Sequence, residues 1–424
     1  MVEQHQLSNG IRVVCEPVTY AHSVAFGVWV RTGSAYESLE NNGIAHMVEH
    51  MVFKRTKKRD AKQIADETAE IGGNLDACTS KEFTSYYAWV LKENLIHTID
   101  LLGDMLTNSL FLDEDLEKEK DIVMEEIDMY HDSPEDVSHE MLQNLVWDNH
   151  PLGYLISGEK DIVEEFCGED LKQFVEEFYT ADNMIISIAG NISWDEIKGA
   201  LEEAFGRIGV SKQAHVIEEP VFCPCVYLEE KDIEQVHLNI AYQSITSISE
   251  ERYVLAVVNA ILGAGVNSRL FLKVREEMGL AYAVYSYGSA FQKAGLLHLY
   301  AGLNANQFEP AMEAIGQEIK KLKKEPPKET EIVCAREQIK TDLIIQKENI
   351  KGRMNNNARE ILLFNRIKPY EETIFKLNQV DKDQIIEYIQ RWFCADKMAF
   401  SVVGNLKETS KERKTLPYLK GFFI

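Results

Sequence analysis

Alternating and helical patterns of apolar residues follow one another along the chain. Apolar runs predict strands over 11–17, 23–32 and 236–243, and an alternating stretch predicts a hairpin region over 75–91. Apolar positions with a period near 3.6 predict helices over 43–53, 60–71, 95–106, 113–130 and 251–262. Mixed strands and helices of this kind predict α+β domains, each with a mostly antiparallel sheet and helices packed on one face.

One stretch of this pattern occurs twice. Residues 183–192 and 397–406 each form an apolar strand that ends in Gly-Asn, and each follows an aromatic pair and Ala-Asp. The two aspartates, Asp182 and Asp396, are 396 − 182 = 214 positions apart, about half the chain. This spacing predicts two similar domains rather than a solenoid, whose period would be roughly 20–50 residues. The alternative is a chance match between two unrelated strands.

Domain boundaries follow from this repeat. Residues 207–235 carry glycine, proline and charge without a helical period, so the linker is placed at 211–235. We therefore expect a first domain at 1–210 and a homologous second domain at 236–424.

Composition narrows the classes of partner. The 424 residues are 45% hydrophobic and 27% charged, as in globular proteins, and the formal net charge is −24. Such an acidic chain should bind nucleic acid or anionic membranes poorly, because their phosphates would be repelled, and should suit neutral or basic ligands better. No apolar run approaches the roughly 18 residues of a membrane span, and no signal peptide is visible.

The seven cysteines include no C-x-x-C pair, which argues against a zinc ribbon or a redox motif. Scattered thiols fit a reducing compartment. Because Met1 leads directly into domain sequence, we expect the bacterial cytoplasm, with the mitochondrial matrix as the alternative.

The helix predicted at 43–53 carries the candidate chemistry. It is apolar nearly all round, and its only polar side chains after Gly43 are His46, Glu49 and His50. Such a helix is buried, and burying a carboxylate with two imidazoles requires compensating partners. His46 and His50 are four positions apart, so both imidazoles leave one face and can meet one tetrahedral metal ion. With Glu49 they form H-x-x-E-H, in which the glutamate takes a proton from zinc-bound water. The alternative is two core histidines bonded to the backbone.

The helix predicted at 113–130 offers a third metal ligand. At 100° per residue, Glu119 and Glu126 fall within its apolar stripe, whereas Glu125 lies about 100° away, toward solvent. Glu126 can therefore face the core and reach a metal, while Glu119 can orient a ligand histidine. The alternative is a solvated run of charges. The other histidines in this region, His131 and His139, are expected at the surface.

His46, Glu49, His50 and Glu126, which stands 126 − 50 = 76 positions after His50, together resemble the zinc signature of the pitrilysin family. That family includes mitochondrial processing peptidase and insulin-degrading enzyme, and its two-domain members are about this long and duplicated in this way. The resemblance implies one Zn²⁺ per chain, held by His46, His50 and Glu126, with Glu49 as the general base. It also implies that Glu119 stands behind a ligand histidine.

Two further segments resemble elements of this family. Arg275 and Tyr282 resemble an arginine–tyrosine pair that binds the substrate carbonyl at the zinc site; the alternative is a surface charge and the start of a strand. The other segment resembles the edge strand onto which family members lay the substrate backbone, by β-augmentation; the alternative is ordinary sheet. Its residues are Asn74, Leu75, Asp76, Ala77, Cys78 and Thr79. Asp76 departs from the family, since many relatives have asparagine there.

The resemblance implies a zinc metalloendopeptidase that hydrolyses peptides or unfolded segments. Four half-chain domains form a clam-shaped chamber in this family, so we expect a homodimer, or a heterodimer with a paralogue. Arg275 and Tyr282 would then act on the partner's zinc. Basic peptides would be favoured if the acidic charge lines the chamber.

Three alternatives remain open. They are a processing peptidase that makes single cuts in presequences, a non-catalytic binding or scaffold subunit, and a metal-binding regulatory protein. The duplicate of the zinc helix, at 254–262, has neither His nor Glu, so the second domain is expected to lack the zinc motif.

Overall fold

The computed structural model describes residues 2–211, 215–405 and 415–423. The chain divides into two compact units. Unit 1 consists of Met1–Asp128, Tyr154–Ile217 and Ile344–Ile367, and unit 2 consists of Met129–Gly153, Glu218–Leu343 and Lys368–Ile424. Parts of two sequence predictions, namely residues 212–214 of the linker and residue 406 of the repeat, lie outside the described residues.

Unit 1 is built on a sheet that, in the described part of the chain, has six strands in the order β1-β2-β6-β3-β5-β4. Neighbouring strands are antiparallel, except that β2 and β6 run parallel. The strands are β1 (Glu3–Gln6), β2 (Arg12–Pro17), β3 (Ser23–Val30), β4 (Asn74–Thr79), β5 (Thr84–Leu91) and β6 (Met184–Gly190). The mostly antiparallel sheet predicted from the sequence is confirmed.

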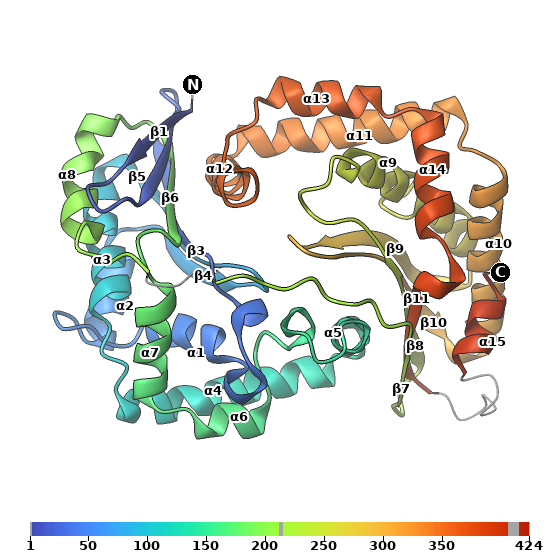
Figure 1. The fold of residues 1–424 in the computed structure, drawn as a ribbon, viewed down its shortest axis with the longest axis horizontal. Helices are drawn as coiled ribbons and strands as arrows, with labels where there is room; N and C mark the ends of the chain where they lie inside the picture. Colours follow the sequence, from blue (N-terminus) through green and yellow to red (C-terminus); the bar gives the residue numbers. More distant parts are fainter. Residues whose placement is uncertain (1, 212–214, 406–414, 424) are drawn as a thin grey trace. The chain divides into compact units, whose positions relative to one another are not determined.

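Helices cover both faces of this sheet (Figure 1). The larger set packs on one face. It comprises α1 (Ile44–Met51), α2 (Ala61–Glu70), α3 (Leu95–Asn108), α4 (Asp113–Asp132), α6 (Lys160–Glu165), α7 (Gly168–Phe178) and α8 (Trp194–Phe205). On the other face, Met354 and Ile361 of α12 (Ile350–Phe364) pack with Val14 and Trp29. Because both faces are covered, β3 is almost entirely buried rather than alternating.

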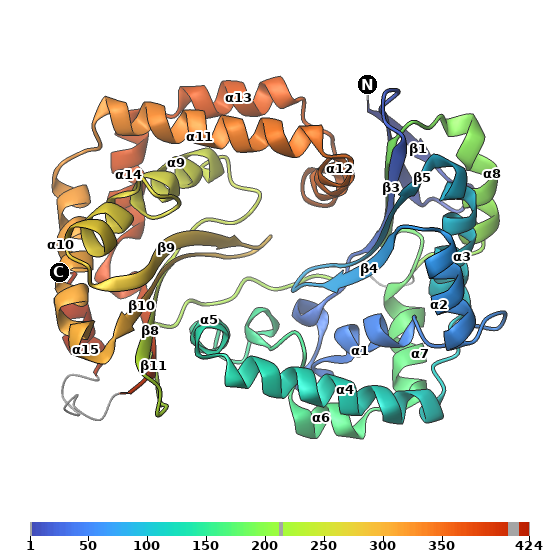
Figure 2. The same ribbon diagram turned by 180° about the vertical axis from the view of Figure 1, so that it is seen from behind.

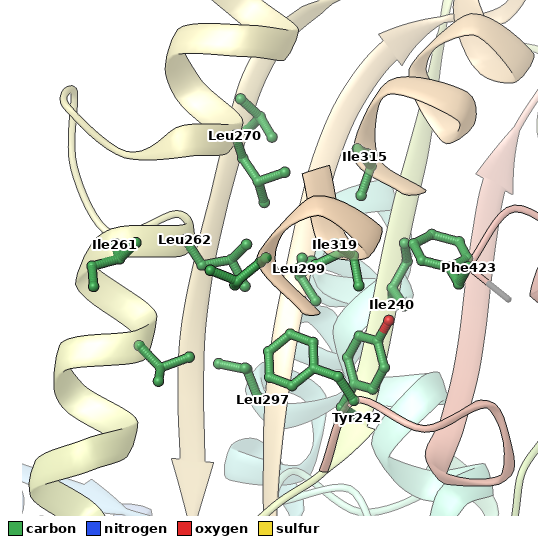
Figure 3. Close-up of a cluster of buried hydrophobic side chains, with 14 of the residues drawn as sticks. Ile240, Tyr242, Ile261, Leu262, Leu270, Leu297, Leu299, Ile315, Ile319 and Phe423 are labelled. Carbon is green, nitrogen blue, oxygen red and sulfur yellow. The ribbon is translucent and has the colours of Figure 1, made fainter. Parts of the chain in front are cut away.

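Unit 2 repeats this plan with five described strands in the order β7-β11-β8-β10-β9. Only β7 and β11 run parallel. The strands are β7 (Val226–Glu230), β8 (Gln235–Gln243), β9 (Ala281–Ala290), β10 (Gly295–Asn304) and β11 (Met398–Gly404). The helices of its main core are α9 (Arg252–Leu262), α10 (Phe308–Lys324), α11 (Glu329–Glu348), α13 (Tyr370–Gln379), α14 (Lys382–Trp392) and α15 (Leu416–Gly421). Figure 3 shows how Leu262 of α9 and Ile319 of α10 meet Ile240 and Leu299 of the sheet.

The other face of the unit 2 sheet is covered by α5 (Pro134–Val146). This contact is polar and aromatic: Nδ1 of His139 lies 2.7 Å from the hydroxyl of Tyr287 and 2.7 Å from the amide of Asn239. His139 also lies beside His298, at 6.1 Å between ring centroids. The expectation that His139 is a surface residue was wrong, because its partners come from distant strands and cannot be read from its sequence neighbours.

Short helical turns connect these elements. They are η1 (Ser34–Tyr36), η2 (Leu39–Asn41), η3 (Lys92–Asn94), η4 (Pro151–Gly153), η6 (Ala305–Gln307) and η7 (Ala395–Lys397), together with a π-helix, η5 (Phe271–Glu277). No helix in the described residues is long and apolar enough to cross a bilayer.

The two sheets confirm the duplication. Strands β2-β6-β3-β5-β4 of unit 1 correspond in order to β7-β11-β8-β10-β9 of unit 2. The first residues of β2 and β7 are 226 − 12 = 214 positions apart, and those of β6 and β11 are 398 − 184 = 214 apart. Strand β7 therefore lies inside the stretch assigned to the linker from sequence. Its half-exposed residues at a sheet edge give only a weak hydrophobic pattern.

The compact units do not coincide with the homologous halves, because each half contributes one segment to the other unit (Figures 1 and 2). Residues 129–153, with α5, belong to unit 2, and residues 344–367, with α12, belong to unit 1. These segments are themselves equivalent, since 344 − 129 = 215 and 367 − 153 = 214. The boundaries predicted at 1–210 and 236–424 describe the halves, and as domain boundaries they stay a prediction.

Candidate metal centre

The helix that carries the histidines is fixed at its first turn by a buried carboxylate. Glu37, which is 4% exposed, accepts hydrogen bonds from the backbone N–H groups of Gly43 (2.8 Å) and Ala45 (2.9 Å). A carboxylate at this end complements the helix dipole and the unpaired N–H groups of the first turn. Burial nevertheless raises the pKa of Glu37 to about 7, against the effect of these hydrogen bonds. Sequence reasoning did not identify Glu37.

Helix α1 directs two histidines toward Glu126 of α4. The Nε2 atoms of His46 and His50 lie 3.7 Å and 3.6 Å from Oε2 of Glu126. The candidate ligand atoms of the three residues all lie within 4.8 Å of one another, and among the described residues they are the one group of this kind. The three ligands predicted from the helical period therefore lie together. Glu125, which the same period places toward solvent, is exposed.

The donor set fits a zinc ion. Burial, with a contribution from neighbouring His50, lowers the pKa of His46 to about 3, so its imidazole stays neutral, as a metal ligand must be. Its Nδ1 atom is buried without a hydrogen-bond partner among the described residues. Two imidazoles and one carboxylate are the three-ligand set of a catalytic zinc site with an open position.

Glu119 stands behind His50, as predicted. Its Oε1 atom lies 2.9 Å from Nδ1 of His50, and its Oε2 atom lies 2.5 Å from Nζ of Lys54. Burial acts to raise the pKa of Glu119, but the hydrogen bonds from His50 and Lys54 outweigh it and leave that pKa lowered. A carboxylate held ionised in this way fixes the tautomer and the orientation of a ligand imidazole. Lys54 was missed by sequence reasoning, since no spacing rule connects it to Glu119.

Glu49 lies on the same helix, partly buried, and contacts strand β4. The hydroxyl of Thr79 donates a hydrogen bond to Oε2 of Glu49. Burial raises the pKa of Glu49, and the hydrogen bonds from Thr79 offset part of this effect. The carboxylate is thus held beside the candidate metal ligands, and its role as general base stays a prediction.

The predicted substrate segment, Asn74–Thr79, is β4, at one edge of the unit 1 sheet. Asn74, Asp76 and Cys78 are exposed, while Thr79 is buried. Oδ1 of Asp76 accepts a hydrogen bond from the backbone N–H of Ala77, at 2.9 Å. An edge strand is what β-augmentation requires, and the binding of substrate here stays a prediction.

Arg275 and Tyr282 belong to unit 2, in η5 and at the start of β9. The structure brings them together: the guanidinium of Arg275 lies 5.9 Å from the ring centroid of Tyr282 and 4.9 Å from that of Phe271. Tyr282 is 77% exposed. Its hydroxyl is thus available to a ligand or partner, and its catalytic role stays a prediction.

Two solved structures share this fold over almost the whole chain. A protease from Helicobacter pylori superposes with a TM-score of 0.87 at 20% identity and covers 95% of this chain and 99% of its own. A structure described as a peptidase M16 inactive domain, from Pseudomonas fluorescens, gives a TM-score of 0.88 at 18% identity, covering 95% and 98%. At such identities the likeness concerns the fold.

Sequence comparisons identify the family. Residues 12–160 match the model for insulinase, peptidase family M16, and residues 167–339 match the M16 inactive domain. The zinc protease YmxG of Bacillus subtilis is 39% identical over 396 residues, which cover 93% of this chain and 97% of YmxG. A zinc protease of Rickettsia felis is 34% identical over 394 residues, which cover 92% and 94%. The resemblance to the pitrilysin family is confirmed, and this chain belongs to peptidase family M16.

Proposed function

We propose that this chain is a zinc metalloendopeptidase that hydrolyses peptides or unfolded segments. The observation that carries the proposal is the convergence of His46, His50 and Glu126, with Glu49 on the same helix. The names of the relatives, which are zinc proteases, support it. The same relatives are bacterial, which favours the bacterial cytoplasm over the mitochondrial matrix.

In this proposal, His46, His50 and Glu126 hold one Zn²⁺ per chain. When bound, zinc supplies a Lewis acid and lowers the pKa of its water. Glu49 accepts the proton of the attacking water and passes it to the leaving amine as the peptide C–N bond breaks. Glu119, with Lys54 behind it, keeps the His50 imidazole in one orientation.

Substrate binding would use the backbone groups of β4 and the side chains of Arg275 and Tyr282 in unit 2. The edge of β4 offers main-chain hydrogen bonds to an extended peptide, which give affinity with little demand on sequence. Tyr282 and Arg275 would donate to the developing oxyanion. We further propose that two chains, identical or paralogous, form a closed chamber in which these two residues serve the partner's site. With a net charge of −24, basic peptides would be favoured if the acidic residues line this chamber.

Metal content and hydrolysis, measured together, test the proposal. Wild type and His50→Ala should be purified, their zinc quantified, and cleavage of a fluorogenic peptide followed with and without chelator. About one zinc per chain that is lost in His50→Ala and is required for cleavage is the expected result. Glu49→Gln should retain zinc and lose hydrolysis. A wild type that binds zinc but cleaves nothing would instead favour a binding or regulatory family member.

The number of cuts separates two kinds of peptidase. Basic presequence peptides and unrelated peptides should be incubated with the active protein and the products identified by mass. Many cuts in both sets are expected of a general endopeptidase, whereas one cut confined to presequences would identify a processing peptidase.

A further inference from the structure

We propose that Thr79 is a positioning residue for Glu49 and thereby connects the general base to the edge of the sheet at which substrate binds. This inference rests on the proposed peptidase function and extends it. Thr79 is the last residue of β4 and is 8% exposed, so its side chain faces the protein interior rather than a bound peptide.

Thr79 presents its hydroxyl to the Glu49 carboxylate. The hydroxyl bonds Oε2 of Glu49, and the backbone N–H of Thr79 helps to lower the pKa of the same carboxyl. This contact restricts both the distance and the rotation of the carboxylate. Because proton transfer requires atoms within hydrogen-bond reach, such restriction affects rate more than binding.

The hydroxyl of Thr79 is committed to Glu49 by its surroundings. Its other close neighbour is the hydroxyl of Thr84, at 3.4 Å between oxygens. Thr84 uses its own hydroxyl hydrogen to bond the carbonyl of Thr32, at 3.0 Å. Each hydroxyl has one hydrogen, so the Thr84 hydroxyl donates to Thr32 and the Thr79 hydroxyl donates to Glu49.

The hairpin register places Thr79 at the end of the open edge. The N–H of Ser80 donates to the carbonyl of Phe83 at 2.9 Å, so the backbone groups of Ser80 point toward β5. Backbone directions alternate along a strand, and those of Thr79, Ala77 and Leu75 therefore point away from β5. A peptide pairing with this outward row would end at Thr79, whose hydroxyl bonds Glu49. Substrate register and base position are consequently fixed by the same residue.

The test compares Thr79→Val, which keeps the shape and removes the hydroxyl, with Thr79→Ser, which keeps the hydroxyl. Thr98→Val is the matched control, because Thr98 is also buried and bonds only its own helix backbone. With zinc bound, kcat of Thr79→Val should fall about 10- to 100-fold at an unchanged KM. Thr79→Ser should retain most of the activity, and zinc affinity, measured by chelator competition, should be that of wild type in every variant.

A second readout does not depend on turnover. The ¹³C resonance of the labelled Glu49 carboxyl, identified by its absence in Glu49→Gln, should shift in metal-free Thr79→Val and stay near its wild-type position in Thr79→Ser and Thr98→Val. An unmoved resonance in Thr79→Val overturns the proposal even if the wild type proves inactive. The proposal would also be overturned if Thr79→Val kept the wild-type kcat, or if Thr79→Ser lost as much kcat as Thr79→Val. A loss of zinc affinity that accompanies the loss of kcat would overturn it as well. A zinc-loaded but inactive wild type refutes the peptidase function itself.

Discussion

Replacing Glu119 by glutamine should weaken zinc binding while leaving the fold intact. Glu119 is 4% exposed, and its two oxygens contact His50 at 2.9 Å and Lys54 at 2.5 Å. Glutamine keeps the volume and one acceptor oxygen but removes the charge, so His50 loses a charge-assisted hydrogen bond and Lys54 loses its counter-ion. Residues in this position behind a ligand histidine typically contribute 10- to 100-fold to metal affinity, or about 1.4 to 2.8 kcal/mol.

Competition with a fluorescent chelator, on metal-free protein at one pH and ionic strength, measures this effect. Glu125→Gln is the control, since Glu125 lies on the same helix but is exposed. His50→Ala should lose more affinity than Glu119→Gln, and the double variant should lose no more than His50→Ala alone, because Glu119 acts through His50. Wild-type zinc affinity in Glu119→Gln would refute the reasoning. So would an additive double variant, which would mean that Glu119 acts on the metal by another route.

Three further predictions concern pH, the substrate edge and the dimer. Burial lowers the pKa of His298 to about 3, so the unfolded chain takes up its proton first as the pH falls below about 6.5, and this residue should lower the stability by about 2 kcal/mol between pH 7 and pH 5. In urea unfolding of metal-free protein at both pH values, the change in stability from pH 7 to pH 5 should be less unfavourable by about that amount in His298→Gln than in wild type, and the same change in both proteins would contradict the prediction. Asp76→Ala should free the outward N–H of Ala77 for substrate and lower KM about 2- to 10-fold without changing kcat. Asp76→Asn, which keeps an acceptor oxygen, should stay near wild type, and an unchanged KM in Asp76→Ala would show that this hydrogen bond does not compete with substrate. Mixing Glu49→Gln with Tyr282→Phe chains should restore activity if Tyr282 acts on the partner's site, and inactive mixtures that exchange subunits would exclude this.

The metal ligands could be predicted because their geometry is local. His46 and His50 share a helix face by spacing alone, and the period of α4 separates Glu126 from exposed Glu125. Lys54 and Glu37 carry no such signal. Each is one charge among many in a chain that is 27% charged, and its partner is identified only by the packing of distant segments.

The same limit applies to the fold. Strands with buried residues on both faces, such as β3 and β6, produce long apolar runs, and their ends were predicted to within two residues. Edge strand β7 was missed because its residues are only half-buried. His139 was misplaced because its neighbours in the sequence are polar, whereas its partners in space lie on β8 and β9. Which sheet a helix covers is decided by packing, so the exchange of α5 and α12 has no local signature.

That exchange has consequences for the duplication of a single ancestral domain and for the response of the chain to proteolytic cleavage. A protease cut in the stretch before β7 would leave an N-terminal fragment that retains α5 but lacks α12, the cover for Val14 and Trp29. The C-terminal fragment would have the converse defect. Neither piece would be a finished domain, so the two should remain bound to each other after nicking and should reassemble when expressed as separate polypeptides. Two halves that exchange a helix in this way must both be kept, including the second half, whose residues 254–262 contain neither His nor Glu.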